Sequence, residues 1–139
     1  MNKRIIDFIF EMKSGCSEKE LNIREKLKLS PAEFRGILVL SPKVIISCKV
    51  LAKKMGLSVS RGSRVVEKLM KNGYLKEENN PEDRRVLNVT LAKKGIKTRE
   101  KISEMLDECE NAIYKKMSKS ELETLVISLA KINDVLISN

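Results

Sequence analysis

The sequence predicts a mostly α-helical fold with one small β hairpin, and three observations carry that prediction. Two helical segments are separated by a glycine-containing turn between residues 47 and 73, and a strand-turn-strand pattern follows them directly. Both ends of the chain carry apolar residues at helical spacing. With 34% charged and 42% hydrophobic residues, the 139-residue chain is expected to fold as one domain rather than to stay disordered.

The chain is expected to open with a helix over residues 2–14, whose apolar surface extends almost around the helix. Gly15 is expected to end this helix or to mark a break in it. Residues 17–29 interleave charged and apolar side chains, and two interpretations stay open there. The segment either continues the first helix after a break or forms a loop.

A helix start is predicted at the sequence Ser-Pro-Ala-Glu of residues 30–33. Serine at the N-cap and glutamate three residues later form a capping box, and proline suits the first helical position. This helix is expected to stop near the Ser41-Pro42 pair. Residues 44–46 are apolar and β-branched, so they are predicted to form a short strand that pairs with the hairpin.

The segment from residue 47 to residue 73 is predicted to be a helix-turn-helix. Ser47 is placed as the N-cap of its first helix, and Gly56 lies in the tight turn. Ser58 can cap the second helix, which covers about residues 58–72, and Gly73 is a typical glycine just past a helix end.

The second of these helices has two faces. Gly62, Val65, Val66 and Leu69 form a stripe that suits a core, whereas small hydroxyls and long guanidinium groups lie on the other side. Such a face suits the DNA major groove, because arginine bonds guanine O6 and N7 together and serine contacts either base type. The candidate DNA-contacting residues are Ser58, Ser60, Arg61, Ser63, Arg64 and Lys68 on this helix, and Lys49 and Lys53 on the one before it.

A hairpin is predicted after this helix. Residues 74–78 and 84–91 read as strands, and the Asn-Asn-Pro-Glu-Asp stretch of residues 79–83 supplies the turn. A hairpin that directly follows a recognition helix is a wing, and this wing carries Arg84 and Arg85 at its tip. Residues 30–91 are therefore predicted to form a winged helix-turn-helix lobe.

Two long helices are predicted after the hairpin, at residues 93–116 and from the capping box at residues 118–121 onwards. The terminal helices, within residues 1–29 and 92–139, show more apolar surface than one small domain can cover. Ordinary core packing is one interpretation, and a dimer interface built from both termini is the favoured one. The candidate dimerisation residues are Ile5, Ile6, Ile9, Leu125, Leu129, Ile132 and Leu136.

The distribution of charge indicates a polyanionic partner. The net charge is +9, and residues 49–99 hold fourteen basic and five acidic side chains, so the rest of the chain is neutral. A merely soluble, lysine-rich surface would spread its excess over the other segments as well. The concentration of charge on residues 49–99 is instead the electrostatic footprint of a nucleic-acid-binding protein.

Several other classes of protein are not expected. The chain has no histidine and no CxxC pair among Cys16, Cys48 and Cys109, so neither a metal site nor a cofactor is expected. It also has no phosphate-binding loop and no nucleophile motif, which argues against an enzyme. The absence of a signal-peptide pattern and of a long apolar run predicts a cytoplasmic protein with no membrane partner.

The stretches LAKKMGLSVSRGSRVVEKLMKNGYL and PEDRRVLNVTLAKKG resemble the winged helix-turn-helix of the MarR family of bacterial and archaeal repressors. The resemblance includes the Asp83-x-Arg85 pattern of the wing and implies one MarR-like domain over residues 1–139. The chain departs from the family at three positions. Val50 stands where glutamate is common, Gly62 where an aliphatic residue is usual, and Ala92 where a threonine usually caps the next helix.

The resemblance also implies an architecture and a mode of regulation. Family members are homodimers joined by their terminal helices, and such a dimer would read a pseudo-palindromic operator. Arg85 would enter the minor groove with Asp83 holding its guanidinium, although a hairpin salt bridge without a role in DNA binding is the other interpretation. A small aromatic anion, bound in a cleft between the lobe and the dimer helices, would cause the release of DNA. Relatives that sense oxidants use an N-terminal cysteine, for which Cys16 is the candidate here; a plain thiol is the other interpretation.

The expected function is that of a sequence-specific regulator of transcription that binds double-stranded DNA, most simply a repressor released by a small-molecule effector. The recognition helix, residues 58–72, would lie in the major groove and the wing, residues 79–85, in the minor groove. Two alternatives stay open: a sequence-neutral architectural DNA-binding protein, and a thiol-based redox-sensing repressor that acts through Cys16.

Overall fold

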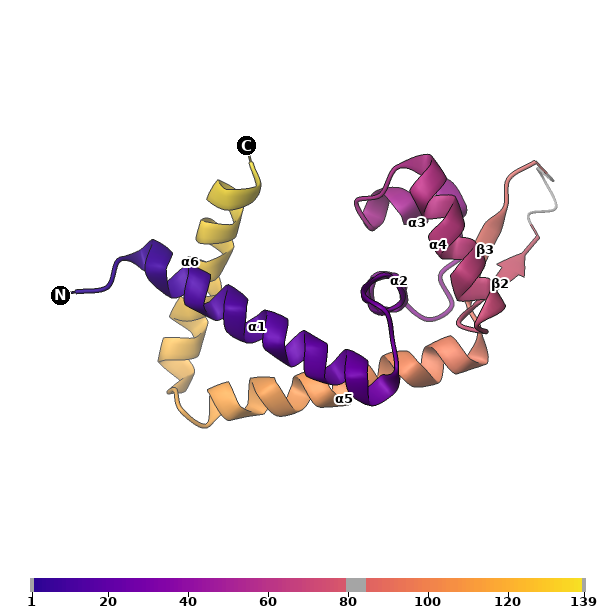
Figure 1. The fold of residues 1–139 in the computed structure, drawn as a ribbon. Helices are drawn as coiled ribbons and strands as arrows, with labels where there is room; N and C mark the ends of the chain where they lie inside the picture. Colours follow the sequence, from indigo (N-terminus) through magenta and orange to yellow (C-terminus); the bar gives the residue numbers. More distant parts are fainter. Residues whose placement is uncertain (1, 80–84, 139) are drawn as a thin grey trace. The chain divides into compact units, whose positions relative to one another are not determined.

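The computed structural model describes residues 2–79 and 85–138. This part of the chain is mostly α-helical with one small antiparallel sheet, which confirms the predicted fold class (Figure 1). It divides into two compact units, Met1–Ile102 and Ser103–Asn139, which are treated separately below. The single-domain interpretation stays a prediction. The elements are α1 (Ile5–Leu27), α2 (Pro31–Val39), β1 (Ile46–Ser47), α3 (Cys48–Lys54), α4 (Val59–Lys71), β2 (Leu75–Glu78), β3 (Asn88–Leu91), α5 (Lys93–Tyr114) and α6 (Lys119–Ile137).

The first helix runs without a break, so both the expected break at Gly15 and the loop interpretation of residues 17–29 are wrong. A glycine inside a helix costs about 1 kcal/mol relative to alanine. One such residue is not enough to end a helix of 23 residues. The helix begins later than expected, at the Arg4 N-cap, whose backbone N–H donates to Asp7 Oδ2 at 3.0 Å. It ends where Lys28 adopts a left-handed φ of 56°.

The capping box at the start of α2 is confirmed. Glu33 N donates to Ser30 Oγ and Ser30 N donates to Glu33 Oε1, both at 3.1 Å. The strand predicted at residues 44–46 is displaced, because β1 comprises only Ile46–Ser47. The carbonyl of Val44 accepts a hydrogen bond from the side chain of Thr90, at 2.8 Å, instead of joining the strand ladder.

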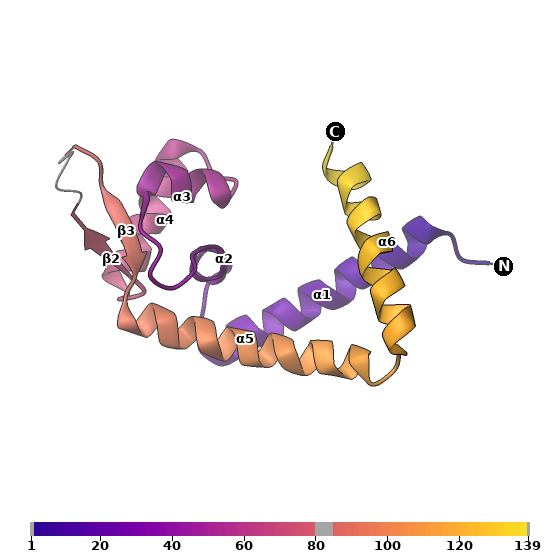
Figure 2. The ribbon, with the colours of Figure 1, turned by 180° about the vertical axis from the view of Figure 1, so that it is seen from behind.

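The sheet has the strand order β1-β3-β2 and is antiparallel throughout, with Ile46 opposite Val89 and Leu75 opposite Leu91. Figure 2 shows β2 and β3 side by side. The central strand of the sheet, β3, is shorter than the predicted strand over residues 84–91. Residues 85–87 lie outside it. The carbonyl of Leu87 accepts a hydrogen bond from Cys48 N at the start of α3, at 3.0 Å, one residue beyond the Ser47–Asn88 pair and in the same register.

The core of the first unit is aliphatic and lies where the winged lobe meets α5. Side chains from five elements are at most 1% exposed, namely Ile37, Leu51, Val66, Leu69, Val89 and Ile102. The chain contains only five aromatic residues and no tryptophan, so branched aliphatic side chains supply this packing. The lobe therefore holds α3, α4 and the hairpin against one shared core.

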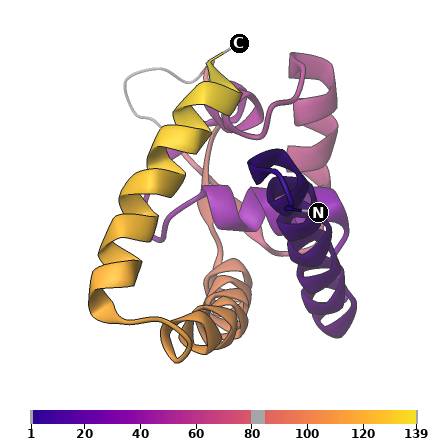
Figure 3. The same cartoon turned by 90° about the vertical axis from the view of Figure 1, so that its left-hand side faces the viewer.

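The second unit contains the end of α5 and all of α6 (Figure 3). The capping box at its start is confirmed, since Ser118 Oγ accepts from Glu121 N and Glu121 Oε1 accepts from Ser118 N, both at 3.1 Å. Helix α5 ends at Tyr114, slightly before the predicted end. Helix α6 has no residue that is buried within the chain. Within the described residues, no helix is long and apolar enough to cross a membrane.

Candidate nucleic-acid interface

Helix α4 presents the two faces that its sequence predicts. Ser58 is its N-cap, and its hydroxyl oxygen accepts a hydrogen bond from Arg61 N at 3.3 Å. Gly62, Val66 and Leu69 are buried on the inner face. The outer face is exposed to solvent and carries Ser60, Arg61, Ser63, Arg64 and Lys68. The oxygen of the Ser58 hydroxyl is used by the cap, and its hydrogen can still be donated to a phosphate.

The glycine that departs from the family pattern lies where α3 and α4 make their closest approach. A Cβ atom at position 62 would overlap the Cβ of Ala52 and would lie 3.3 Å from its Cα. Both of these atoms are fixed to the backbone of α3, so no change of rotamer could make room. Gly62 therefore lets the two helices of the helix-turn-helix pack with their backbones close together.

The C-terminal end of α4 is tied to two other helices of the same unit. Asn72 Nδ2 donates to Glu33 Oε2 at 3.0 Å, which links the end of α4 to α2. Lys94 Nζ donates to the carbonyl of Asn72 at 2.8 Å, which links it to α5. Gly73, with a φ of 83°, ends the helix as predicted.

Glu33 is charged in this arrangement although it is almost completely buried. Burial raises the pKa of its carboxyl, but hydrogen bonds from Asn72 and Ser30 and the nearby charge of Lys68 outweigh burial, so the net pKa is lowered. The negative charge on α2 therefore helps to hold the end of α4 in place. The sequence showed Glu33 only as part of a capping box; its second partner lies 39 residues away.

The start of α3 and residues 85–87 lie beside the outer face of α4. Ser47 caps α3 by accepting a hydrogen bond from Val50 N at 3.2 Å, and the side chains of Lys49 and Lys53 are exposed. A hollow of about 410 Å³ lies between α3, α4 and residues 85–87. It is lined by Ser47, Cys48, Lys49, Val59, Ser63, Arg85, Val86 and Leu87. The structure thus gathers Lys49, Ser63 and Arg85 around one depression, whereas Arg84 and Asp83 lie outside the described residues.

Val59 is a surface residue that the sequence did not single out. It precedes Gly62 by three positions, so its spacing alone would place it on the buried stripe of α4. In the structure it is 66% exposed, because the first turn of α4 projects beyond the core. Sequence periodicity could not separate it from the core residues, since only the position of α3 decides where the buried stripe begins.

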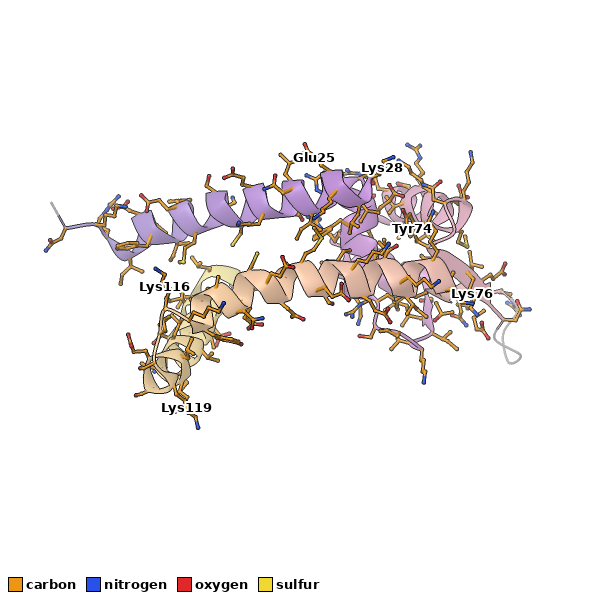
Figure 4. All side chains as sticks on the ribbon, turned by 90° about the horizontal axis from the view of Figure 1, so that it is seen from below. Glu25, Lys28, Tyr74, Lys76, Lys116 and Lys119 are labelled. Atoms are coloured by element: carbon orange, nitrogen blue, oxygen red, sulfur yellow. The ribbon has the colours of Figure 1, made fainter. Side chains whose placement is uncertain are left out.

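A second hollow, of about 570 Å³, lies between the end of α1, the start of α5 and Tyr74, the residue just before β2. Its walls are Leu27, Tyr74, Lys93, Lys94, Lys97, Thr98 and Lys101. Figure 4 labels Tyr74. Lys94 Nζ lies 4.5 Å from the centroid of the Tyr74 ring and thus places a cation against an aromatic face. Basic groups and an aromatic ring are therefore available together at this hollow.

The three cysteines are free and occupy different surroundings. Cys16 is exposed on α1, and Cys109 is half-buried on α5. Burial raises the pKa of the Cys48 thiol, and the nearby Glu77 carboxylate raises it further. In the described part of the chain, no group of three or more histidine, cysteine or acidic residues could hold a metal ion.

The candidate dimerisation residues lie on surfaces that the chain itself leaves open. On α1, Ile5 is 72% exposed, whereas Ile6 and Ile9 are half-buried. On α6, Leu129 and Leu136 are exposed. Leu125 and Ile132 are half-buried on the same helix.

Comparison with known proteins agrees with this arrangement. Residues 29–87 match the model of the MarR family. An uncharacterized HTH-type transcriptional regulator of Bacillus subtilis, YcgE, is 28% identical over 115 residues, which is 81% of this chain and 73% of that protein. Two solved structures share the fold. Streptococcus pneumoniae FabT in complex with DNA has a TM-score of 0.83 at 20% identity, covering 96% of this chain and 95% of FabT. The apo form of E. coli MarR has a TM-score of 0.72 at 18% identity, covering 95% and 98% of the two chains.

These matches extend over the lobe that carries the basic face and, at the level of the fold, over nearly the whole chain. The resemblance proposed from the sequence is thereby confirmed. Residues 29–87 thus match the MarR family, and the chain is similar to HTH-type transcriptional regulators.

Proposed function

We propose that this protein is a homodimeric, sequence-specific repressor of transcription whose α4 helix reads the DNA major groove. The observation that carries the proposal is the outer face of α4, on which hydroxyl and guanidinium groups are exposed while the inner face is buried. Ser60, Arg61 and Arg64 are assigned to base edges, where arginine can bind guanine bidentately. This face lies within residues 49–99, which hold the whole net charge of the chain, and this placement supports DNA as the partner.

The remaining basic residues are assigned to the DNA backbone. Lys49, Lys53 and Lys68 would contact phosphates and so set the register of the protein without reading sequence. Arg85, in the wing, would approach the minor groove. Each phosphate contact releases counterions, so affinity is expected to fall steeply with salt.

The dimer is proposed to form through α1 and α6. Exposed apolar residues on these helices include Ile5 at 72%, Val126 at 66% and Val135 at 69%. Such surfaces are costly in water and are typical of an interface that a second copy covers. A two-fold dimer presents two α4 helices, so the operator is expected to be a pseudo-palindrome with half-sites about one helical turn apart. We place this activity in the cytoplasm, where a regulator of this family reaches the chromosome.

The test is a selection from random duplexes followed by fluorescence anisotropy on the selected site and on a scrambled duplex. The selected site should bind at least roughly a thousandfold more tightly than the scrambled one. Arg64→Ala should remove much of that gap, whereas the matched variant Lys68→Ala should weaken both duplexes alike. If selection found no preferred sequence, and salt weakened all duplexes equally, the protein would instead be an architectural DNA-binding protein.

Release by a small anion is the proposed mode of regulation, and the hollow at the start of α5 supports it. Lys94 lines this hollow and also donates to the carbonyl of Asn72 at the end of α4. An anion that drew the Lys94 ammonium into the hollow would break its bond to the recognition helix. The Tyr74 ring offers an apolar face to an aromatic anion such as salicylate. The ligand must favour one dimer shape over the other in order to release DNA.

Titration of the operator complex with salicylate, and with inorganic phosphate as the non-aromatic comparison, tests this mode of regulation. Salicylate should release DNA from the wild type and should do so less well from Lys97→Gln, which removes one cation from the hollow. Lys115→Gln, beyond the end of α5 and outside the hollow, is the matched control and should respond like the wild type. Equal release from all three proteins would place the effector elsewhere.

A further inference from the structure

Val59 is the most exposed large apolar side chain of the winged lobe among its described residues. Its exposure is 66%, compared with 52% for Ile45 and 44% for Val50. It is the first residue of α4 and follows the Ser58 cap directly. The N-terminal residues of a recognition helix are those that approach base edges. An apolar group is therefore presented at the end of the helix that would penetrate the groove.

The hollow of about 410 Å³ that Val59 lines combines apolar and cationic residues. Val86 and Leu87 line it with Val59, and the hydroxyl of Ser63 and the cations of Lys49 and Arg85 line it too. This combination suits a duplex, because Lys49 can reach a phosphate while Val59 meets the base edges. An apolar protein partner would gain nothing from these cations.

The methyl group of thymine is the group on the DNA that can contact Val59. Among the four bases, only thymine carries a methyl group, at C5, in the major groove, and apolar side chains recognise it by contact. We infer that Val59 contacts a thymine methyl and sets a preference for thymine at one position in each half-site. The inference rests on the proposed function, in which α4 lies in the major groove.

The experiment uses the full-length dimer and the operator found by selection. Each thymine of a half-site, together with its symmetry mate, is replaced by deoxyuridine, which removes the methyl and leaves base pairing unchanged. Anisotropy then gives Kd for the wild type, for Val59→Ala and for the matched control Val50→Ala. Val50 is also an exposed valine, on α3, and lies outside the hollow.

At one thymine position, the deoxyuridine replacement should weaken binding of the wild type about fourfold per half-site, because burial of one methyl group contributes about that factor. The loss should disappear in Val59→Ala and persist in Val50→Ala. Circular dichroism is expected to be unchanged for Val59→Ala, because the side chain is exposed and alanine is the better helix former.

Two outcomes would overturn the inference while leaving the proposed function intact. Either no deoxyuridine position would weaken binding to the selected operator, or the loss would persist in Val59→Ala. If selection instead found no preferred operator, the proposed function would fail and this inference would fail with it. The selection step thus separates the two failures.

Discussion

Replacing Gly62 with alanine is expected to destabilise the protein, although the same change stabilises most helices. At an unhindered helical position, alanine is favoured over glycine by about 1 kcal/mol. At position 62 the new methyl group would overlap the Cβ of Ala52 and approach its Cα to 3.3 Å. Since neither helix can relieve this overlap by a rotamer change, α3 must move away from α4.

The size of the effect follows from two opposing terms. Overpacking a core typically costs about 1–3 kcal/mol. An overlap between two backbone-anchored methyl groups belongs at the upper end of that range, and the gain in helix propensity offsets about 1 kcal/mol of it. The expected net loss in the free energy of unfolding is therefore about 2 kcal/mol.

Urea unfolding followed by circular dichroism measures this loss, at one fixed protein concentration because dimers gain stability by mass action. Gly15→Ala is the control, since a Cβ at that position in α1 would meet nothing within 4 Å. It should gain about 0.5–1 kcal/mol. Adding Ala52→Gly to Gly62→Ala removes the overlapping methyl group, so the pair should show a coupling energy of about 1 kcal/mol or more.

Either of two results would refute this reasoning. If Gly62→Ala were as stable as Gly15→Ala, α3 and α4 would have room for the methyl group. A Gly62→Ala loss that Ala52→Gly does not reduce would mean that the contact with Ala52 is not its cause.

Three further predictions follow from the described contacts. Glu33→Gln should lower the free energy of unfolding by about 1–2 kcal/mol at pH 7, because the carboxylate accepts hydrogen bonds at the α2 cap and from Asn72. The folded pKa of this carboxyl lies below its ordinary value of 4.5. Its contribution to the free energy of unfolding is therefore present above pH 4.5 and is lost as the pH falls through the folded pKa. A stability difference between variant and wild type that stays constant from pH 7 to pH 3 would contradict this. Leu129→Glu, on the apolar face of α6, should yield monomers in sedimentation, whereas Lys131→Glu on the same helix should remain dimeric; dimers from both variants would exclude this face from the interface. Cys16→Ser should leave operator affinity and its response to hydrogen peroxide unchanged, and a loss of peroxide sensitivity in that variant would support the redox-sensing alternative.

The helix starts that the sequence predicted correctly are those with local causes. The capping boxes at Ser30 and Ser118 each join atoms three residues apart, so no distant part of the chain is needed to form them. The same holds for the glycine that ends α4, which supplies a positive φ at low cost. The two faces of α4 also follow from local periodicity.

The errors have distant causes. The strand at residues 84–91 was predicted too long and the strand at residues 44–46 too early, because strand ends follow from pairing between distant segments, such as Ile46 with Val89. The break at Gly15 was predicted from glycine propensity alone, yet one unfavourable residue does not outweigh a long continuous helix. Hydrogen bonds between distant residues cannot be read from a window of neighbours.

The sequence by itself determined the helix-turn-helix with its capped helices, the placement of the charge and the resemblance to the MarR family, which residues 29–87 match. Each of these depends on residue identity and short-range spacing, which the chain carries in any conformation. Only the tertiary structure decided why position 62 holds glycine, why Glu33 stays charged and why Val59 reaches solvent. Each of those depends on which groups from other parts of the chain lie within a few ångströms of the residue. Those neighbours are in place only once α2, α3 and α4 have packed together.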